Sequence, residues 1–122
     1  MRLLVTGDRK WDDALTIKYE LQEFTDKHGY GMNHTLVHGD ARGADTYAEV
    51  VAQFLGFTIE RHPAEWKKYG SAAGPKRNKE MLDSGVDYWI AFHNDLESSK
   101  GTKNMVKLLQ KAGIPGHVVG GE

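Results

Sequence analysis

The sequence predicts a Rossmann-like α/β fold, a three-layer sandwich in which a mostly parallel sheet of about five strands carries helices on both faces. Short β-prone runs alternate along the chain with longer segments of helical periodicity. The first run, Leu3 to Thr6, is almost continuously apolar, as expected of a strand buried on both faces in a parallel sheet. The alternation continues without a repeat, linker or low-complexity segment, so we expect one domain over residues 1–122.

The first half of the chain predicts three strands separated by two helices. The strand at 3–6 ends at Gly7, and Asp12 or Asp13 can cap a helix that runs to about Lys27. Its apolar residues stand at helical spacing, at Ala14, Ile17, Leu21 and Phe24. Residues 28–31, with two glycines, end this helix. A strand at 35–38, a helix at 44–55 that stops at Gly56 and a strand at 57–61 follow.

The second half predicts two further strands. Residues 63–69 form a short helix or turn with Trp66 facing inward, and the small residues 70–75 form a loop. Pro75 suits the first position of a helix that runs to about Ser84 and ends at Gly85. A strand at 88–92, a polar loop at 93–100, a helix at 102–112 and a last strand at 117–119 complete the order.

Composition excludes several classes of site. The net charge is −1, so no global field draws the chain to nucleic acid or to an anionic membrane. Without cysteine, the chain has no disulfides, thiolate metal sites or cysteine nucleophiles. The start of the chain is not a signal peptide, and no apolar stretch approaches the ~20 residues of a membrane span. We therefore expect a cytoplasmic protein that does not enter membranes.

The predicted site lies in four loops at one edge of the sheet. Ligands of open parallel sheets bind beyond the carboxyl ends of the strands. This rule selects residues 7–9, 38–44, 70–75 and 93–102. Three of these loops run into helix N-termini near a glycine, where free N–H groups and the helix dipole favour phosphate. Each glycine alone is better explained by a tight turn, but four converging loops favour a site.

Charged residues accompany these loops. The cations are Arg9, Arg42, Lys76, Arg77 and Lys100. A guanidinium binds phosphate through two hydrogen bonds, although a single cation is more often simply solvated. Asp8 and Asp45 can hold an arginine, accept a ribose hydroxyl or cap a helix. Trp11 follows the first loop and can stack on a base or pack in the core.

The familiar phosphate and metal motifs are absent. The glycines at 39 and 43 do not have Walker A spacing, and the first strand does not lead into G-x-G-x-x-G. Of the six histidines, His38 and His93 both follow strands and could meet at the sheet edge. For both residues, packing or a hydrogen bond to the ligand is a stronger interpretation than metal binding. We expect no metal and no cofactor.

Five motifs stand in order at 5–11, 38–45, 62–66, 73–81 and 99–102 followed by Met105-Val106, and they include the signatures GxRxW and HGxxxGAD. Together they resemble the YspA-like family of the SLOG superfamily, which is related to the LOG (lysine-decarboxylase-like) and DprA/Smf proteins. The resemblance implies a Rossmannoid domain that binds a nucleotide or a nucleotide-derived signal, as a sensor or signalling module in bacterial or phage settings.

The resemblance leaves open whether the chain is an enzyme. Arg77 and Met81 resemble the Arg-x-x-x-Met of LOG phosphoribohydrolases, and Gly101-Thr102 resembles their Gly-Thr at the phosphate-binding helix. The position of their catalytic glutamate is occupied by Met105, whose thioether cannot act as a general base. Residues 97–100 also differ from the Pro-Gly-Gly of LOG proteins. An acidic residue elsewhere, Asp8, Asp45 or Glu97, would have to substitute.

Our main interpretation is a module that binds a small nucleotide-type ligand through its phosphate. The residues expected to form the site are Gly7, Asp8, Arg9, Trp11, His38, Gly39, Gly43, Ala44, Asp45, Gly74, Pro75, Arg77, Asn78, Ser99, Gly101 and Thr102. One alternative is a phosphoribohydrolase-like enzyme that cleaves an N-glycosidic or phosphate bond. Another is a single-stranded DNA-binding module, which the near-neutral charge and few loop aromatics disfavour. A homodimer is also expected, because many superfamily relatives pair through helices that flank the pocket.

Overall fold

A computed structural model describes residues 1–30 and 33–121 and contains one five-stranded sheet in which every pairing is parallel. The strands are β1 (Arg2–Gly7), β2 (Thr35–His38), β3 (Thr58–Arg61), β4 (Tyr88–Phe92) and β5 (Gly116–Val119). Their order across the sheet is β3-β2-β1-β4-β5. The predicted Rossmann-like α/β class is confirmed, with a sheet that is fully parallel.

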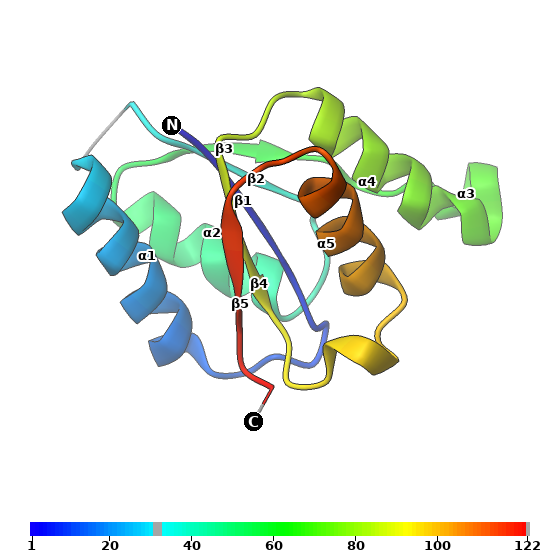
Figure 1. The fold of residues 1–122 in the computed structure, drawn as a ribbon, viewed down its shortest axis with the longest axis horizontal. Coiled ribbons are helices and arrows are strands. Elements are labelled where there is room, and N and C mark those ends of the chain that lie inside the picture. Colours follow the sequence, from blue (N-terminus) through cyan, green and yellow to red (C-terminus); the bar gives the residue numbers. More distant parts are fainter. Residues whose placement is uncertain (31–32, 122) are drawn as a thin grey trace.

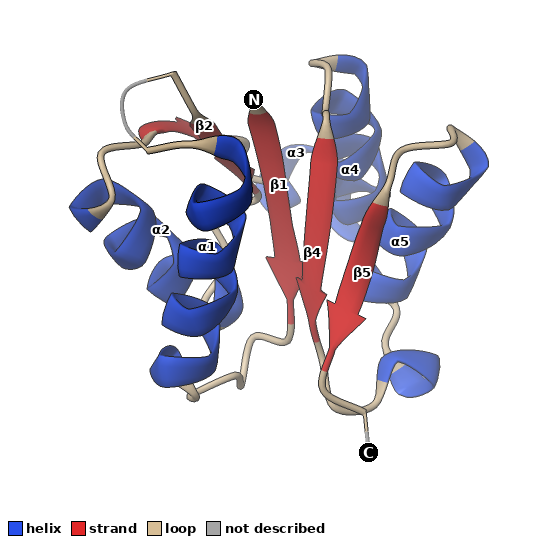
Figure 2. Cartoon of the chain, turned by 60° about the vertical axis from the view of Figure 1, so that its left-hand side comes forward, coloured by secondary structure: helices blue, strands red, loops and turns tan. Residues whose placement is uncertain are grey.

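Helices cover both faces of the sheet. Helices α1 (Ala14–His28) and α2 (Ala44–Phe54) lie on one face, and α4 (Ala73–Asp83) and α5 (Gly101–Lys111) lie on the other (Figure 1, Figure 2). The short helix α3 (Trp66–Tyr69) and the 3₁₀ turns η1 (Gly70–Ala72) and η2 (Leu96–Ser98) lie in the connections. None of the helices in the described part of the chain is long and apolar enough to cross a bilayer.

The sheet separates two hydrophobic cores. Successive side chains of a strand point to opposite faces, so Leu3 and Val5 pack with α1 and α2 while Leu4 packs with α4 and α5. All three are fully buried. The edge strand β3 is only half-buried, which agrees with its polar sequence. Burial of β1 on both faces explains why its sequence is an apolar run instead of an alternating pattern.

Helix α1 begins and ends at the predicted signals. The side chain of Asp13 accepts a hydrogen bond from the backbone N–H of Thr16 at 3.1 Å, so Asp13 is the N-cap. Gly29, with φ +93°, follows the last turn, and its N–H bonds to the Thr25 carbonyl. The remaining glycine of the predicted stop, Gly31, lies outside the described residues.

Two predictions for the segment before β4 are wrong. The loop expected at 70–75 is a 3₁₀ turn followed by the start of α4, which begins at Ala73, two residues before Pro75. Proline fits there because the first N–H groups of a helix have no partner within it. Trp66 does not face inward: it is 46% exposed, and only the edge of its ring packs over Gly74 at the start of α4, where a Cβ would lie 3.1 Å from Cη2.

The connections that follow β1 and β4, two neighbouring strands, lie on opposite faces of the sheet. The chain leaves β1 toward α1 on one face and leaves β4 toward α5 on the other face, so the two connections diverge (Figure 2). The strand ends themselves stay joined, because the Asp8 N–H donates to the Phe92 carbonyl at 2.8 Å. Such a switch point opens a crevice beyond the carboxyl ends of the strands.

Candidate functional site

A groove of about 610 Å³ lies at this switch point, and all four predicted loops or the helix starts that follow them contribute to it. Its predicted members are Gly7, Asp8, Arg9, Asp45, Gly74, Pro75, Arg77, Asn78, Ser99, Gly101 and Thr102. Lining residues outside the predicted list are Thr6, Lys10, Ala41, Trp66, Ser71, His93 and Lys100. Of these, Lys100 was expected among the cations of the site loops, and a hydrogen bond to the ligand was considered for His93. His93 directly follows a predicted strand, and this position was the sequence feature that could have placed it in the groove. Nothing in the sequence placed Trp66 at the surface.

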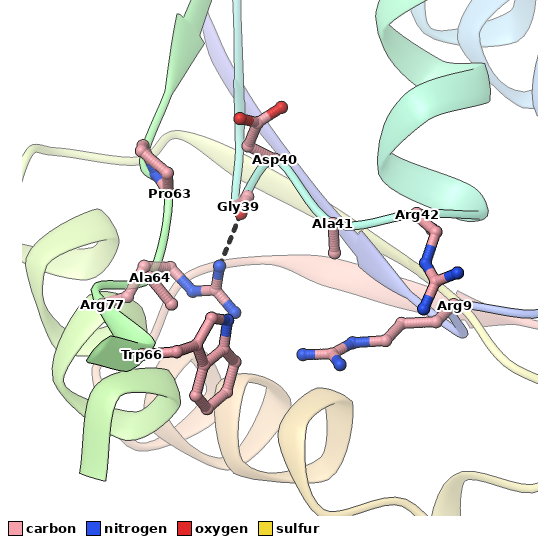
Figure 3. A pocket seen from close by; sticks show the side chains of 9 residues that line it. All are labelled: Arg9, Gly39, Asp40, Ala41, Arg42, Pro63, Ala64, Trp66 and Arg77. Carbon is pink, nitrogen blue, oxygen red and sulfur yellow. Dashed lines mark hydrogen bonds between the residues drawn. The ribbon is translucent and has the colours of Figure 1, made fainter. Parts of the chain in front are cut away.

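A smaller recess of about 250 Å³ adjoins the groove and shares Arg9, Ala41, Trp66 and Arg77 with it (Figure 3). Gly39, another predicted residue, lines this recess. In Figure 3, the side chains of Arg9 and Arg77 extend into it from opposite sides. The two arginines therefore stand at the junction of both hollows.

Arg77 is held in place by the loop after β2. Its Nη1 donates to the carbonyl oxygens of Gly39 and His62, at 2.5 and 3.4 Å, and its Nε donates to Oδ1 of Asn78 at 3.0 Å. Burial lowers the pKa of Arg77, and Asp45 opposes that shift. Even so, a guanidinium stays protonated in proteins. Arg77 thus fixes the loop and brings a partly buried positive charge to the groove.

Arg9 has more freedom than Arg77. Within the described residues, its guanidinium has no hydrogen-bond or carboxylate partner, and its Cζ lies 5.3 Å from the centroid of the Trp66 ring. That distance allows a cation–π contact. Lys10 and Lys100 also line the groove. A cation without a carboxylate partner, next to two lysines, suits an anionic ligand.

The start of α5 is partly capped by the protein itself. Oγ of Ser99 accepts hydrogen bonds from the N–H groups of Thr102 and Lys103, at 3.0 and 3.4 Å. Ser99 therefore acts as a helix cap, which leaves fewer N–H groups for a ligand than the sequence suggested. Gly101 is different, because it lines the groove and a Cβ there would meet no atom within 4 Å. Its backbone is open to close approach by a ligand.

Gly43 and Ala44, both predicted site residues, line neither hollow. Gly43 has φ +75°, and a Cβ there would clash with the backbone of Asp8 and Arg9. The Ala44 N–H donates to the Asp8 carbonyl at 3.1 Å. These residues pack the start of α2 against the β1 loop, so the glycine serves a tight turn and a close approach of two backbones.

His38 and Trp11 also lie away from the groove. Nε2 of His38 lies 2.8 Å from a Glu49 carboxylate oxygen, and its Nδ1 accepts from the Asp40 N–H at 2.9 Å. His38 does not meet His93, because β1 lies between their strands. The described residues contain no group of three metal-ligating side chains.

Trp11 is a core residue. It is buried, its ring centroid lies 5.5 Å from that of Phe92, and its Nε1 donates to the Asp13 carbonyl at 3.0 Å. Both its apolar surface and its polar atom are thus engaged within the protein. The exposed tryptophan at the groove is Trp66.

Asp45 is the most unusual ionisable group of the site. Its Oδ2 accepts hydrogen bonds from the N–H groups of Gly39 and Ala41, at 3.1 and 3.2 Å. Burial raises the pKa of Asp45 to about 6, against the opposing effects of His38, the two N–H groups and Arg77. The carboxylate therefore orients the loop after β2 while it reaches the groove.

Asp8 and His93 form a second polar pair in the groove. Oδ1 of Asp8 accepts from the Lys10 N–H at 2.9 Å, and Oδ2 lies 3.9 Å from Nε2 of His93. Nδ1 of His93 accepts from the Asp95 N–H at 3.0 Å, so a neutral ring carries its proton on Nε2, facing Asp8. The pair combines a carboxylate with a titratable imidazole at the end of β1 and β4.

The sequence matches known proteins over both halves of the chain. A family model described as YAcAr, the YspA, cpYpsA-related SLOG family, matches residues 1–69. The Gene 61 protein of Mycobacterium phage D29 is 40% identical over 119 residues, which cover 93% of this chain and 92% of the phage protein. No solved structure matches. The family match includes the loop after β1, where Arg9 stands, and the start of α2, where Asp45 stands.

Proposed function

Because the chain belongs to the YspA, cpYpsA-related SLOG family, we propose that it binds a nucleotide or a nucleotide-derived molecule in the groove between β1 and β4. In this proposal it acts as a cytoplasmic sensor or signalling module. The observation that carries the proposal is the guanidinium of Arg9, which has no hydrogen-bond or carboxylate partner among the described residues and lines the same groove as Arg77 and the open backbone of Gly101.

The charges and the size of the groove support a phosphate-bearing ligand. Arg9, Arg77 and Lys100 surround it, and arginine pairs with phosphate through two parallel hydrogen bonds. Its volume of about 610 Å³ lies within the range of small-molecule sites, about 300–1,000 Å³. The exposed ring of Trp66 offers an apolar surface for a base at the same place.

Arg9→Ala tests the proposal. Calorimetric titration would use AMP, GMP, CMP and UMP, and the tightest of the four is expected to lose about tenfold or more in affinity, the effect of removing one charged hydrogen-bond donor. Among the described residues, the Arg9 side chain donates no hydrogen bond and its guanidinium lies over the exposed ring of Trp66, so the fold should be unchanged. Arg77→Ala gives a less direct answer, because it also frees the Gly39 carbonyl.

Lys111→Ala is the matched control, because it removes one positive charge from the exposed end of α5 that is remote from the groove. It should bind like the unmodified protein. Equal affinity of the Arg9 and Lys111 variants, or no binding of any of the four nucleotides to the unmodified protein, would contradict the proposal.

A second candidate function is hydrolysis of a nucleotide, favoured by the Asp8–His93 pair. Met105, at the position of the LOG glutamate, is fully buried among core residues, so a catalytic carboxylate would have to come from another residue. Of the three candidates, Asp8 and Asp45 line the groove and Glu97 does not. Chromatography of the four nucleotides after incubation would detect a released base. His93→Gln should abolish that release, and no product at high protein concentration would exclude this activity for these substrates.

We also propose that the chain forms a homodimer through α1 and α2. Apolar side chains are exposed on both helices, with Leu15 at 77%, Val50 at 61% and Phe54 at 93%. A two-fold contact with a second copy would bury the same surface on each protomer. Sedimentation velocity should give a dimer, and Phe54→Glu should give a monomer. A monomeric unmodified protein would refute the proposal.

A further inference from the structure

One oxygen of Asp45 has no partner. Asp45 is the second residue of α2, and its side chain is almost completely buried at the edge of the groove. Its Oδ2 is paired with two backbone N–H groups. Among the side chains of the described residues, Oδ1 is the buried polar atom for which no hydrogen-bond partner exists. Buried polar atoms are usually paired, so this oxygen needs an explanation.

Holding the loop does not explain it. The N–H groups of Gly39 and Ala41 both bond to Oδ2, so a single acceptor oxygen is enough to orient the loop. An asparagine carbonyl could accept the same two bonds without a buried charge. Burial raises the pKa of Asp45 to about 6, so the carboxylate is ionised near neutral pH. A buried, ionised oxygen without a donor destabilises the folded protein. A hydrogen bond from a bound ligand would offset that cost.

The surroundings define what kind of donor would fit. The cations Arg9 and Arg77 line the same groove and would engage the phosphate, so Oδ1 is suited to a neutral, small donor on the same ligand. In a nucleotide, the ribose hydroxyls are such donors and lie close to the phosphate. We infer that Oδ1 of Asp45 accepts a hydrogen bond from a ribose hydroxyl, so that the groove selects ribonucleotides. This inference rests on the proposed function.

Removal of the hydroxyls from the ligand tests the inference on the unmodified protein. Calorimetry would compare AMP, GMP, CMP and UMP with their 2′,3′-dideoxy counterparts. The tightest ribonucleotide should lose about tenfold to a hundredfold in affinity without its hydroxyls, as expected for a hydrogen bond to a charged group. The singly deoxygenated 2′ and 3′ forms then assign the contact to one hydroxyl.

Asp45→Asn, measured with the same ligands, completes a double-mutant cycle in which the other change is the removal of the ribose hydroxyls. Its carbonyl can keep the two loop hydrogen bonds while an NH₂ group replaces the free oxygen. The variant should bind the ribonucleotide and its dideoxy counterpart with similar affinity, so that the two losses are not additive. Asp83→Asn, on the exposed far end of α4, makes the same charge change and should discriminate like the unmodified protein. Circular dichroism checks that both variants are folded.

Three results separate the possibilities. If no ribonucleotide binds, the proposed function fails and this inference fails with it. If ribonucleotides and dideoxynucleotides bind the unmodified protein equally, the proposed function stands and the role of Asp45 is refuted. If Asp45→Asn weakens both ligands equally, Asp45 does not act through the ribose hydroxyls, and the assignment to a ribose hydroxyl is overturned.

Discussion

Glycines around the groove serve different purposes that the sequence alone does not separate. Gly39 lies against Arg77, and a Cβ there would clash with the guanidinium. Gly43 needs its positive φ and its contact with the β1 loop. Gly101 has neither constraint, because a Cβ would enter open space at the groove. A glycine that the fold does not require, at the mouth of a candidate site, marks a place where a ligand would lie.

Gly101→Leu is therefore expected to abolish binding of the nucleotides without loss of stability. The added side chain would occupy the groove, while a Cβ at this first residue of α5 meets no atom within 4 Å, so the fold has room for it. Urea denaturation and calorimetry on the same preparation would measure both effects. A variant that binds normally would show that the ligand does not approach α5.

Asp45 predicts a pH dependence of stability. Its pKa in the folded protein is about 6, above its ordinary value of 3.8, so the folded state binds this proton more tightly than the unfolded state. The unmodified protein should thus lose stability as the pH rises from about 4 to about 6, by roughly 3 kcal/mol at most, and then level off. Asp45→Asn lacks this loss, so its relative stability should rise over the same interval.

Urea denaturation of both proteins between about pH 4 and 6 would measure the difference in their free energies of unfolding. The other carboxylates titrate in both proteins, so their contributions cancel in this difference. The charged groups that act on Asp45 are His38 and Arg77, and both lower its pKa. His38 is common to both proteins. Parallel stability curves would mean that Asp45 does not titrate in this interval.

The tryptophans show where residue-level prediction reached its limit. Trp11 follows β1, where the sequence left open both stacking on a base and packing in the core, and it packs on Phe92 in the core. Trp66 was expected in the core, but it lies at the groove because α3 is a single turn that leaves the ring over Gly74. Apolar spacing cannot distinguish a buried ring from one at a concave surface, since both are next to apolar atoms.

At the level of the elements, α5 depends on Ser99 for its start. Ser99→Ala removes the acceptor for the N–H groups of Thr102 and Lys103 and should destabilise the protein by about 1 kcal/mol. Urea denaturation measures this effect, and Ser98→Ala, an exposed neighbour in η2, is the control. A loss below a few tenths of a kcal/mol would mean that solvent replaces the cap.

The ends of helices and strands were predictable where a capping residue or a glycine stands at the end of the element. Strand β2 lies at Thr35–His38 as predicted, and Asp13 and Gly29 mark the two ends of α1. The segment 70–75 had no such signal, because its small residues fit a loop, a 3₁₀ turn or the first turn of a helix. Packing of Trp66 on Gly74 decides between these forms, and that contact is tertiary.

For the whole molecule, binding of a ligand should raise thermal stability. A ligand at a hundredfold its Kd stabilises a folded protein by about 2.7 kcal/mol. For a chain of this size, that corresponds to an increase of about 10 °C in Tm. Thermal denaturation with and without the tightest ribonucleotide would measure the shift, which Arg9→Ala should reduce at the same concentration. An unchanged Tm at saturating ligand would contradict binding to the folded state.

The fold class followed from the alternation of elements, but the order of the strands did not. Parallel pairing of β1 with β4 joins segments that lie far apart in the chain, and no local pattern encodes that choice. The loops after β1, β2 and β4 converge on one groove because the strands are parallel, whereas residues 70–75 reach the groove through the position of η1 and the start of α4. The side of each loop that faces the groove depends on contacts such as those of Gly43 and His38, which appear only in three dimensions.

The two hydrophobic cores and the loops that line the groove consist of different residues, which has a practical consequence for engineering. The side chains that stabilise the sheet, such as Leu3, Leu4 and Val5, are fully buried and separate from the loops that line the groove. Libraries confined to Arg9, Lys10, Lys100 and Gly101, which are exposed and line the groove, would therefore vary recognition on a constant scaffold. This chain is a candidate framework for grafting new small-molecule specificities by loop exchange.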